Sequence, residues 1–235
     1  MKILALDTTT EACSAALQSG NDIHDLYQVA PRRHAELILP MVDDLLEKAG
    51  LELAQLDCIA FARGPGAFTG VRLCTSIAQG LAFAAEVPVL GISTLATMAQ
   101  GYSGDVRTIL AAIDARMGEI YWGLFQQDEK HCVQALGSEA VCKPGELEIS
   151  LDSDIRNHRC LEISLDSDIY GCGTGWGKYE DILSQKTSKH LVGINPAQLP
   201  NAKDMLPLAR ESLEQGKSCL AKQAMPVYLR NKVTG

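Results

Sequence analysis

Residues Ala62–Arg72 read ARGPGAFTGVR, a glycine-rich stretch between two apolar segments. An apolar run, LDCIAF, precedes it, and a small-residue run, LCTSIAQGLAFAAE, follows it. Glycines allow another group to approach the backbone closely, and a helix N-terminus after such a loop favours an anion. Three readings are therefore open: a phosphate cradle, a tight structural corner, or a surface that binds another protein.

The known nucleotide fingerprints fit this loop poorly. A Walker loop requires Lys after its final glycine, where this chain has Val71. The dinucleotide fingerprint, started at Gly64, requires a third glycine where Thr69 stands. The structural corner and the protein-binding surface remain as alternatives.

The run after the loop predicts a helix from about residue 69 to residue 86, with Thr69 as its N-cap. The helix carries two apolar stripes, whereas a surface helix needs one. The first comprises Val71, Cys74, Ala78, Leu81 and Ala85, and the second Leu73, Ile77, Gly80 and Ala84. Such a helix is either sandwiched inside the chain or meets another chain on its outer side, and the sequence leaves both open.

The rest of the chain predicts an α/β fold of two related domains, each with a mixed sheet flanked by helices. Residues 1–103 read as β-β-β-α-β-α-β-α and form the first domain. Residues 104–235 form the second, which begins with a strand pair around the turn ARMG. A helix in NAKDMLPLARESLEQGK lies near the C-terminus, and this end of the chain is a candidate to pack back on the first domain.

Composition narrows the class of protein. The 235 residues carry a formal net charge of −8, which argues against a stand-alone nucleic-acid binder. None of the eight cysteines forms a C-x-x-C pair, which favours a reduced, intracellular protein. The N-terminus lacks a signal-peptide core, and no apolar run reaches membrane-spanning length. These features together predict a cytoplasmic protein with no membrane partner.

Candidates for catalysis or ligand binding are few. The turn LDTTT places Asp7 and Thr9 after the first strand, where they either hold a metal–phosphate group or satisfy the turn by local hydrogen bonds. The five histidines include no pair four residues apart, so a helical zinc pair is absent from the sequence. The segment LEISLDSDI occurs twice, at Leu147–Ile155 and Leu161–Ile169, and reads as a local duplication rather than a calcium loop.

Several longer stretches together resemble the TsaB (YeaZ) family of bacterial tRNA threonylcarbamoyladenosine biosynthesis proteins, which are glycoprotease-like (peptidase M22-like). The matching pieces include ILALDTTTEACSAAL, ARGPGAFTGVRLCTSIAQGLA, VPVLGISTLATMAQ, AIDARMGEIYWGLF and the terminal PVYLR. The glycine loop combined with DARMGEIYW is specific, although Ala67 stands where the family loop commonly has Ser. The resemblance implies an actin-like ATPase (ribonuclease-H-like, or ASKHA) fold.

The resemblance also implies a role. Members of the family are read as non-catalytic scaffolds that bind a catalytic paralogue, TsaD, and support modification of adenosine 37 of tRNA. The ATPase TsaE joins the assembly, tRNA is reached only through the complex, and a homodimer forms when the protein is alone. The metal pair of the paralogue, H-x-x-x-H, falls on Thr94 and Met98, which are poor metal ligands, so no metal site is expected here.

On this reading the first domain carries the partner interface and no catalytic residue is present. No firmly bound cofactor is expected, with ATP or ADP at the partner junction left open, and Asp7 and Thr9 are the cofactor-binding candidates. The alternative is an enzyme of the same fold, either a metal-dependent glycoprotease-like protein or a phosphotransferase, whose nucleotide cleft would use Gly171, Gly173, Gly175 and Gly177. The predicted interface residues are Gly66, Phe68, Thr69, Arg72, Cys74, Ala78 and Leu81.

Overall fold

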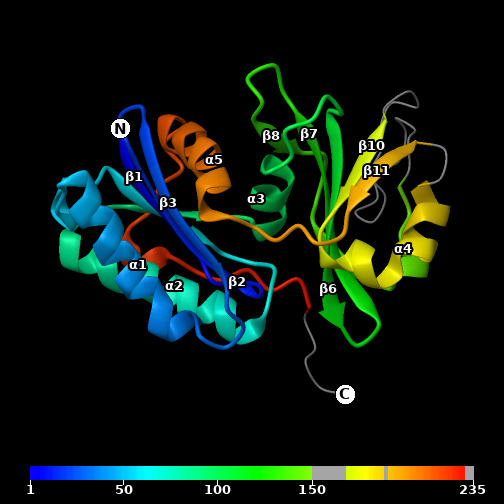
Figure 1. Cartoon of the computed structure of the whole chain (residues 1–235), viewed down its shortest axis with the longest axis horizontal. Helices are drawn as coiled ribbons and strands as arrows, with labels where there is room; N and C mark the ends of the chain where they lie inside the picture. Colours follow the sequence, from blue (N-terminus) through cyan, green and yellow to red (C-terminus); the bar gives the residue numbers. More distant parts are fainter. Residues whose placement is uncertain (150–167, 188–189, 231–235) are drawn as a thin grey trace. The chain divides into compact units, whose positions relative to one another are not determined.

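A computed structural model describes residues 1–149, 168–187 and 190–230, which form two compact units (Figure 1). The first unit combines Met1–Thr97 with Pro200–Val227, and the second combines Met98–Leu199 with Tyr228–Gly235. The sequence places a single boundary near residue 103, whereas the contacts divide the chain at two further points near its C-terminus. Each unit contains one sheet, so the α/β class with two mixed sheets is confirmed.

The sheet of the first unit has the strand order β3-β2-β1-β4-β5. β1 (Lys2–Asp7) pairs antiparallel with β2 (Ala12–Ser19) and parallel with β4 (Cys58–Ala62), whereas β3 (Asp22–Val29) and β5 (Val89–Ile92) are the two edges. Apolar side chains of β1 and β4 are buried on both faces, as is typical of central strands covered by helices.

Helices cover both faces of this sheet. α1 (His34–Ala49) and α2 (Phe68–Ala85) lie on one face, and α5 (Ala202–Glu214) lies on the other (Figure 1). Ile38, Val42 and Leu45 of α1 face inward, and the helix ends at Gly50. A short α3 (Thr94–Gln100) follows β5, and its first turn is capped by the hydroxyl of Ser93.

The start of α2 differs from the prediction. The N-cap is Ala67 and the helix begins at Phe68, so Thr69 lies inside the first turn rather than capping it. The reason is tertiary: the Ala67 amide donates to the Thr9 carbonyl at 2.8 Å, and this contact sets where the loop ends.

The second unit contains a sheet of order β11-β10-β6-β7-β8, and β9 pairs with the N-terminal part of β7. β6 (Thr108–Arg116) and β7 (Glu119–Gln127) form the hairpin predicted around ARMG, and β8 (Val133–Ala135) is its predicted third strand. The remaining elements are β9 (Ala140–Cys142), β10 (Ile169–Cys172), α4 (Thr174–Thr187) and β11 (Leu191–Asn195). Short 3-10 helices occupy Leu53–Gln55, Pro144–Glu146 and Ala221–Gln223.

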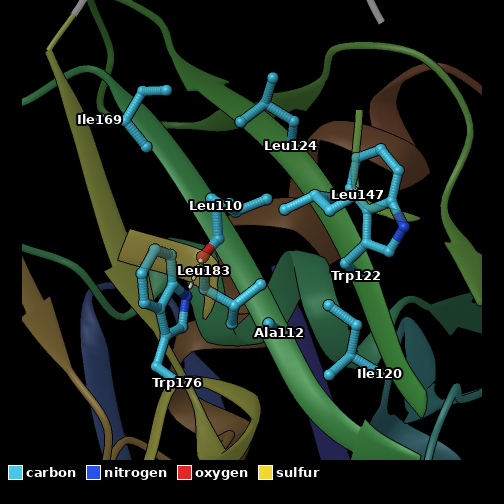
Figure 2. Close-up of a cluster of buried hydrophobic side chains, with 9 residues drawn as sticks. All are labelled: Leu110, Ala112, Ile120, Trp122, Leu124, Leu147, Ile169, Trp176 and Leu183. Carbon is cyan, nitrogen blue, oxygen red and sulfur yellow. Dashed lines mark hydrogen bonds between the residues drawn. The ribbon is translucent and has the colours of Figure 1, made fainter. Parts of the chain in front are cut away.

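The core of the second unit lies between β6, β7, β10 and α4 (Figure 2). Two tryptophans, Trp122 of β7 and Trp176 of α4, are its largest members, and the indole Nε1 of Trp176 donates to the Leu110 carbonyl at 3.0 Å. This bond satisfies the buried indole and fixes α4 against β6.

Among the described residues, no helix has both the length and the apolar character needed to cross a membrane. Most of the duplicated LEISLDSDI segment falls outside the described residues.

Candidate functional site

The glycine loop, residues 63–67, joins β4 to α2 and packs on the chain's own β1–β2 turn. A Cβ on Gly66 would lie 2.4 Å from the Thr9 carbonyl oxygen, and one on Gly70 would lie 2.2 Å from that of Thr8. The hydroxyl of Thr8 donates to the Gly70 carbonyl at 2.8 Å. Only glycine permits such approach, so the loop is a tight structural corner locked to the first turn.

The β1–β2 turn is stabilised by Asp7 and Thr9, the two cofactor-binding candidates. The Oδ1 atom of Asp7 accepts from the backbone N–H and from the hydroxyl of Thr9, both at 2.7 Å. The hydroxyl of Thr94 donates to that of Thr9 at 3.1 Å. Hydrogen bonds within the turn thus occupy the Oδ1 atom of Asp7, an arrangement typical of turn residues.

Asp7 is nevertheless an unusual carboxyl group. Burial raises its pKa to about 6, against the lowering effect of the two bonds from Thr9. Its Oδ2 atom is buried and has no hydrogen-bond partner within the described part of the chain. A carboxylate in this setting loses hydration without full compensation, so its ionised form is costly.

The inner face of α2 packs on its own sheet. Cys74 and Ala78 are completely buried, and the Cys74 thiol donates to the Leu6 carbonyl of β1 at 3.2 Å. These two residues were predicted to line a partner interface, and this is corrected by their burial within the chain. Val71, Cys74 and Ala78 of the first stripe thus form the core face of the helix, whereas Leu81 and Ala85 of the same stripe are half-buried.

The outer face of α2 is exposed and partly apolar. Phe83 is 80% exposed, Phe68 is 49% exposed, and Leu73, Ile77 and Leu81 are half-buried. The guanidinium of Arg72 lies 3.6 Å from the centre of the Phe68 ring, an arrangement typical of a cation–π contact. Of the predicted interface residues, Phe68, Thr69, Arg72 and Leu81 lie on accessible parts of the helix, and Gly66 is half-buried in the loop.

Sequence reasoning did not select Phe83, the most exposed apolar side chain of α2. A signal was present, because Phe83 lies three residues after Gly80 and so joins the second stripe at helical spacing. Which stripe faces outward could be decided only once the contacts of α2 with β1 and β4 were visible.

The C-terminal segment of the first unit runs beside the loop and α2. The amide of Gln79 on α2 donates to the Ala224 carbonyl at 2.8 Å, and the Val227 N–H donates to the Arg63 carbonyl at 2.8 Å. Met225, between these bonds, is largely exposed. The accessible surface next to α2 therefore includes a segment more than a hundred residues away in the sequence.

In the second unit, the last residue of the motif PVYLR contacts the hairpin that carries DARMG. Arg230 of the terminal motif donates to the Ala115 carbonyl at 3.0 Å and to the Glu119 carboxylate. Arg116 and Met117 at the hairpin tip have positive φ angles of 62° and 55°. Arg230 thus stabilises a hairpin in which two non-glycine residues have unfavourable positive φ angles.

The positions that would carry the paralogue's metal pair are interior. Thr94 and Met98 are both buried, and the Thr94 N–H donates to the Gly64 carbonyl at 3.0 Å. Across the residues that the structure describes, no group of three or more His, Cys, Asp or Glu is placed to hold a metal ion.

The second-unit glycines, the nucleotide candidates of the enzyme reading, have close neighbours from their own unit. A Cβ on Gly171 would overlap the Trp176 ring, and one on Gly175 would lie 2.9 Å from the Ala112 Cβ. Gly173 has a φ of 104° at the turn from β10 to α4. These glycines allow β10 and α4 to pack closely on β6.

Comparison with known proteins identifies the family. The chain matches the family model described as "TsaD: tRNA N6-adenosine threonylcarbamoyltransferase" over residues 16–234. It is 44% identical over 236 aligned residues to the tRNA threonylcarbamoyladenosine biosynthesis protein TsaB of Escherichia coli, covering 99% of this chain and 96% of that protein. The corresponding TsaB of Haemophilus influenzae is 41% identical, with 100% of this chain and 95% of that protein covered.

Solved structures agree with this assignment. A crystal structure from Pseudomonas aeruginosa, described as similar to peptidase YEAZ, superposes with a TM-score of 0.85 at 44% identity, covering 97% of this chain and 99% of that one. A second, YeaZ from Pseudomonas aeruginosa, gives 0.83 at 43% identity with the same coverage. The chain therefore belongs to the TsaB (YeaZ) family of tRNA threonylcarbamoyladenosine biosynthesis proteins.

Proposed function

We propose that this chain is a non-catalytic scaffold in the biosynthesis of N6-threonylcarbamoyladenosine in tRNA, and that it docks the transferase TsaD through the outer face of α2. The observation that carries the proposal is the accessible apolar surface of α2, in which Phe68 and Phe83 are exposed and Leu73, Ile77 and Leu81 are half-buried. An exposed apolar patch with a polar surround is typical of a protein-binding site. Burial of this patch would supply about 25 cal/mol per Å² before the costs of association.

The rest of the first unit supports docking rather than chemistry. The glycine loop is closed onto the β1–β2 turn, and Ala67, whose amide begins α2, already donates to Thr9. The loop thus holds the N-terminus of α2 in a fixed position relative to the sheet. Rigid presentation reduces the entropy lost on binding.

Family membership supports an expectation about the wider assembly. We expect the ATPase TsaE to join the pair and tRNA to be bound through the complex, since the net charge of −8 disfavours direct binding to phosphates. In the absence of TsaD, a second copy of this chain is expected to cover the outer face of α2. ATP or ADP, if bound, belongs at the junction with the partner. We expect the protein to act in the cytoplasm, where tRNA is modified.

The test is substitution of Phe83 by Asp, followed by titration of the purified chain with its cognate TsaD by isothermal calorimetry. A charge at the most exposed apolar side chain of the patch should weaken binding by tenfold or more, about 1.4 kcal/mol, and should reduce tRNA modification in a reconstituted reaction in proportion. The matched control is Ile182 of α4, 41% exposed and in the second unit, substituted by Asp. Equal affinity of the Phe83 variant and the wild type would refute docking through α2.

A further inference from the structure

The edge strand β3 offers a surface that the proposed function does not use. β3 is the terminal strand of its sheet, and seven of its eight residues are exposed, with Leu26 half-buried. Ile23, Tyr27 and Val29 are 48%, 42% and 55% exposed. A long edge strand with apolar side chains is a template for a further strand.

The register of β2 and β3 shows which backbone groups face outward. Ser19 pairs with Asp22 across a two-residue turn, and the flanking pair of such a turn exchanges both hydrogen bonds. At the other end, the Ala30 N–H donates to the Glu11 carbonyl at 3.1 Å. Even-numbered residues of β3 therefore bond to β2. The backbone groups of the odd-numbered residues Ile23, Asp25, Tyr27 and Val29 point away from the sheet.

We propose that β3 pairs antiparallel with β3 of a second copy of this chain, about a two-fold axis at Leu26, so that the two sheets become continuous. This register places Ile23 opposite Val29 and Asp25 opposite Tyr27 of the other copy. Each of these pairs joins outward-facing backbone groups, so the hydrogen-bond pattern of an antiparallel ladder is satisfied.

Side-chain chemistry selects this register over its neighbours. An axis at Asp25 would set the two Asp25 carboxylates against each other, which is unfavourable. An axis at Tyr27 would set Asp25 against the apolar Val29. The axis at Leu26 instead gives a phenol hydroxyl opposite a carboxylate, an apolar pair, and leucine against leucine. Of these three registers, only the one with its axis at Leu26 pairs side chains of complementary charge and polarity.

The pairing is independent of the proposed docking to TsaD. α2 contacts β4, β1 and β5, whereas β3 lies at the opposite edge of the sheet from β5. Both helices near β3 leave it accessible, because α1 lies chiefly over β2 and α5 chiefly over β1 and β2. The outer face of α2 therefore stays free when two β3 strands pair.

Cysteine cross-linking tests the register directly. In the proposed pair Leu26 faces Leu26 across a non-hydrogen-bonded site, where the Cα separation of about 4.5 Å suits a disulfide. With oxidised glutathione, the full-length Leu26→Cys variant should form covalent dimers about tenfold faster than Gln28→Cys, which would face His24 instead. Wild-type protein gives the background from the native cysteines.

A second set of variants keeps the test informative if Leu26→Cys folds poorly. An equimolar mixture of His24→Cys and Gln28→Cys, both at exposed positions, should cross-link faster than either alone. Equal rates for the mixture and its components, or for Leu26→Cys and Gln28→Cys when both are folded, would overturn the proposal. Protection of β3 by its charged residues against self-association would then be the better account.

A charge cycle provides an independent readout in sedimentation velocity, with every variant made in the Phe83→Asp background so that a dimer through α2 does not contribute. Tyr27→Asp faces Asp25 of the other copy and should raise the dissociation constant of this dimer by about tenfold. Adding Asp25→Lys restores opposite charges across the strand and should restore the dimer. Failure of the double variant to recover self-association, with circular dichroism unchanged, would also count against the pairing, whatever the outcome for TsaD binding.

Discussion

Asp7 shows how one residue of the first turn shapes stability. Burial raises its folded pKa from 3.8 to about 6, so the folded state holds the proton more tightly than the unfolded chain. The stabilising contribution of this proton is complete below pH 3.8 and is lost as the pH rises through 6. Above that range ionised Asp7 destabilises the fold by about 3 kcal/mol, since one pKa unit corresponds to about 1.36 kcal/mol.

The Asp7→Asn variant should therefore gain stability relative to wild type as the pH rises. The asparagine side-chain oxygen can still accept from Thr9, and the side chain carries no charge. We expect the difference in the free energy of unfolding to shift by about 2 kcal/mol in favour of the variant between about pH 4.5 and about pH 8, because the carboxyl of the unfolded chain is already largely ionised at the lower pH. Urea denaturation at both pH values measures this, and a difference that does not change with pH would contradict it.

Two glycines of α2 should respond oppositely to the same substitution. Alanine at Gly70 would place a methyl group 2.2 Å from the Thr8 carbonyl oxygen, whereas alanine at Gly80 meets nothing within 4 Å. We expect Gly70→Ala to lower the free energy of unfolding by about 1–3 kcal/mol or more. Gly80→Ala should raise it by about 0.5–1 kcal/mol through helix propensity. Chemical denaturation of both variants measures these two changes in the free energy of unfolding. Similar changes for the two variants would contradict the close packing of Gly70 on Thr8.

At the level of the element, α2 separates a core face from an outer face. Ala78 is completely buried against the sheet, so Ala78→Asp would place an unpaired charge in the core. We expect this variant to lose its cooperative thermal transition, whereas Phe83→Asp should melt within a few degrees of wild type. A folded Ala78→Asp protein would show that this face of α2 is not held against the sheet as the structure has it.

The same helix shows what sequence patterns can predict. Periodicity identified both stripes of α2, and alternation and turn residues identified every strand of the first sheet, because these depend on local spacing. The assignment of Cys74 and Ala78 to an interface was wrong because both stripes are apolar, and small residues fit a tight interior as well as a partner. Thr69 was wrongly expected to cap the helix because the contact between Ala67 and Thr9 joins segments far apart in sequence.

At the scale of the whole molecule, the C-terminal segment was the least predictable part. Cys219 exchanges backbone hydrogen bonds with Val89 at the β5 edge, at 2.8 and 3.0 Å, and residues 224–227 continue beside α2. Backbone pairing at a sheet edge does not require particular side chains. The sequence of this stretch therefore carries no hydrophobic periodicity from which its position could be predicted. The helix before it, in which Leu206 and Ala209 are buried, was predictable, and the sequence named the first domain as a candidate for its packing; which face of the sheet it covers was not predictable.

Nucleotide binding by the isolated chain separates the scaffold from a phosphotransferase. The loop that would cradle a phosphate is closed onto Thr8 and Thr9, and the second-unit glycines serve packing, so we expect about 1 mM MgATP to shift the melting temperature by less than about 1 °C. A site with a dissociation constant of about 10 μM would instead add about 2.7 kcal/mol and several degrees. The control is the cognate TsaD under the same conditions. A shift of several degrees for this chain alone, abolished by substitution at Gly175, would favour the enzyme reading, because the same glycines would then hold a ligand.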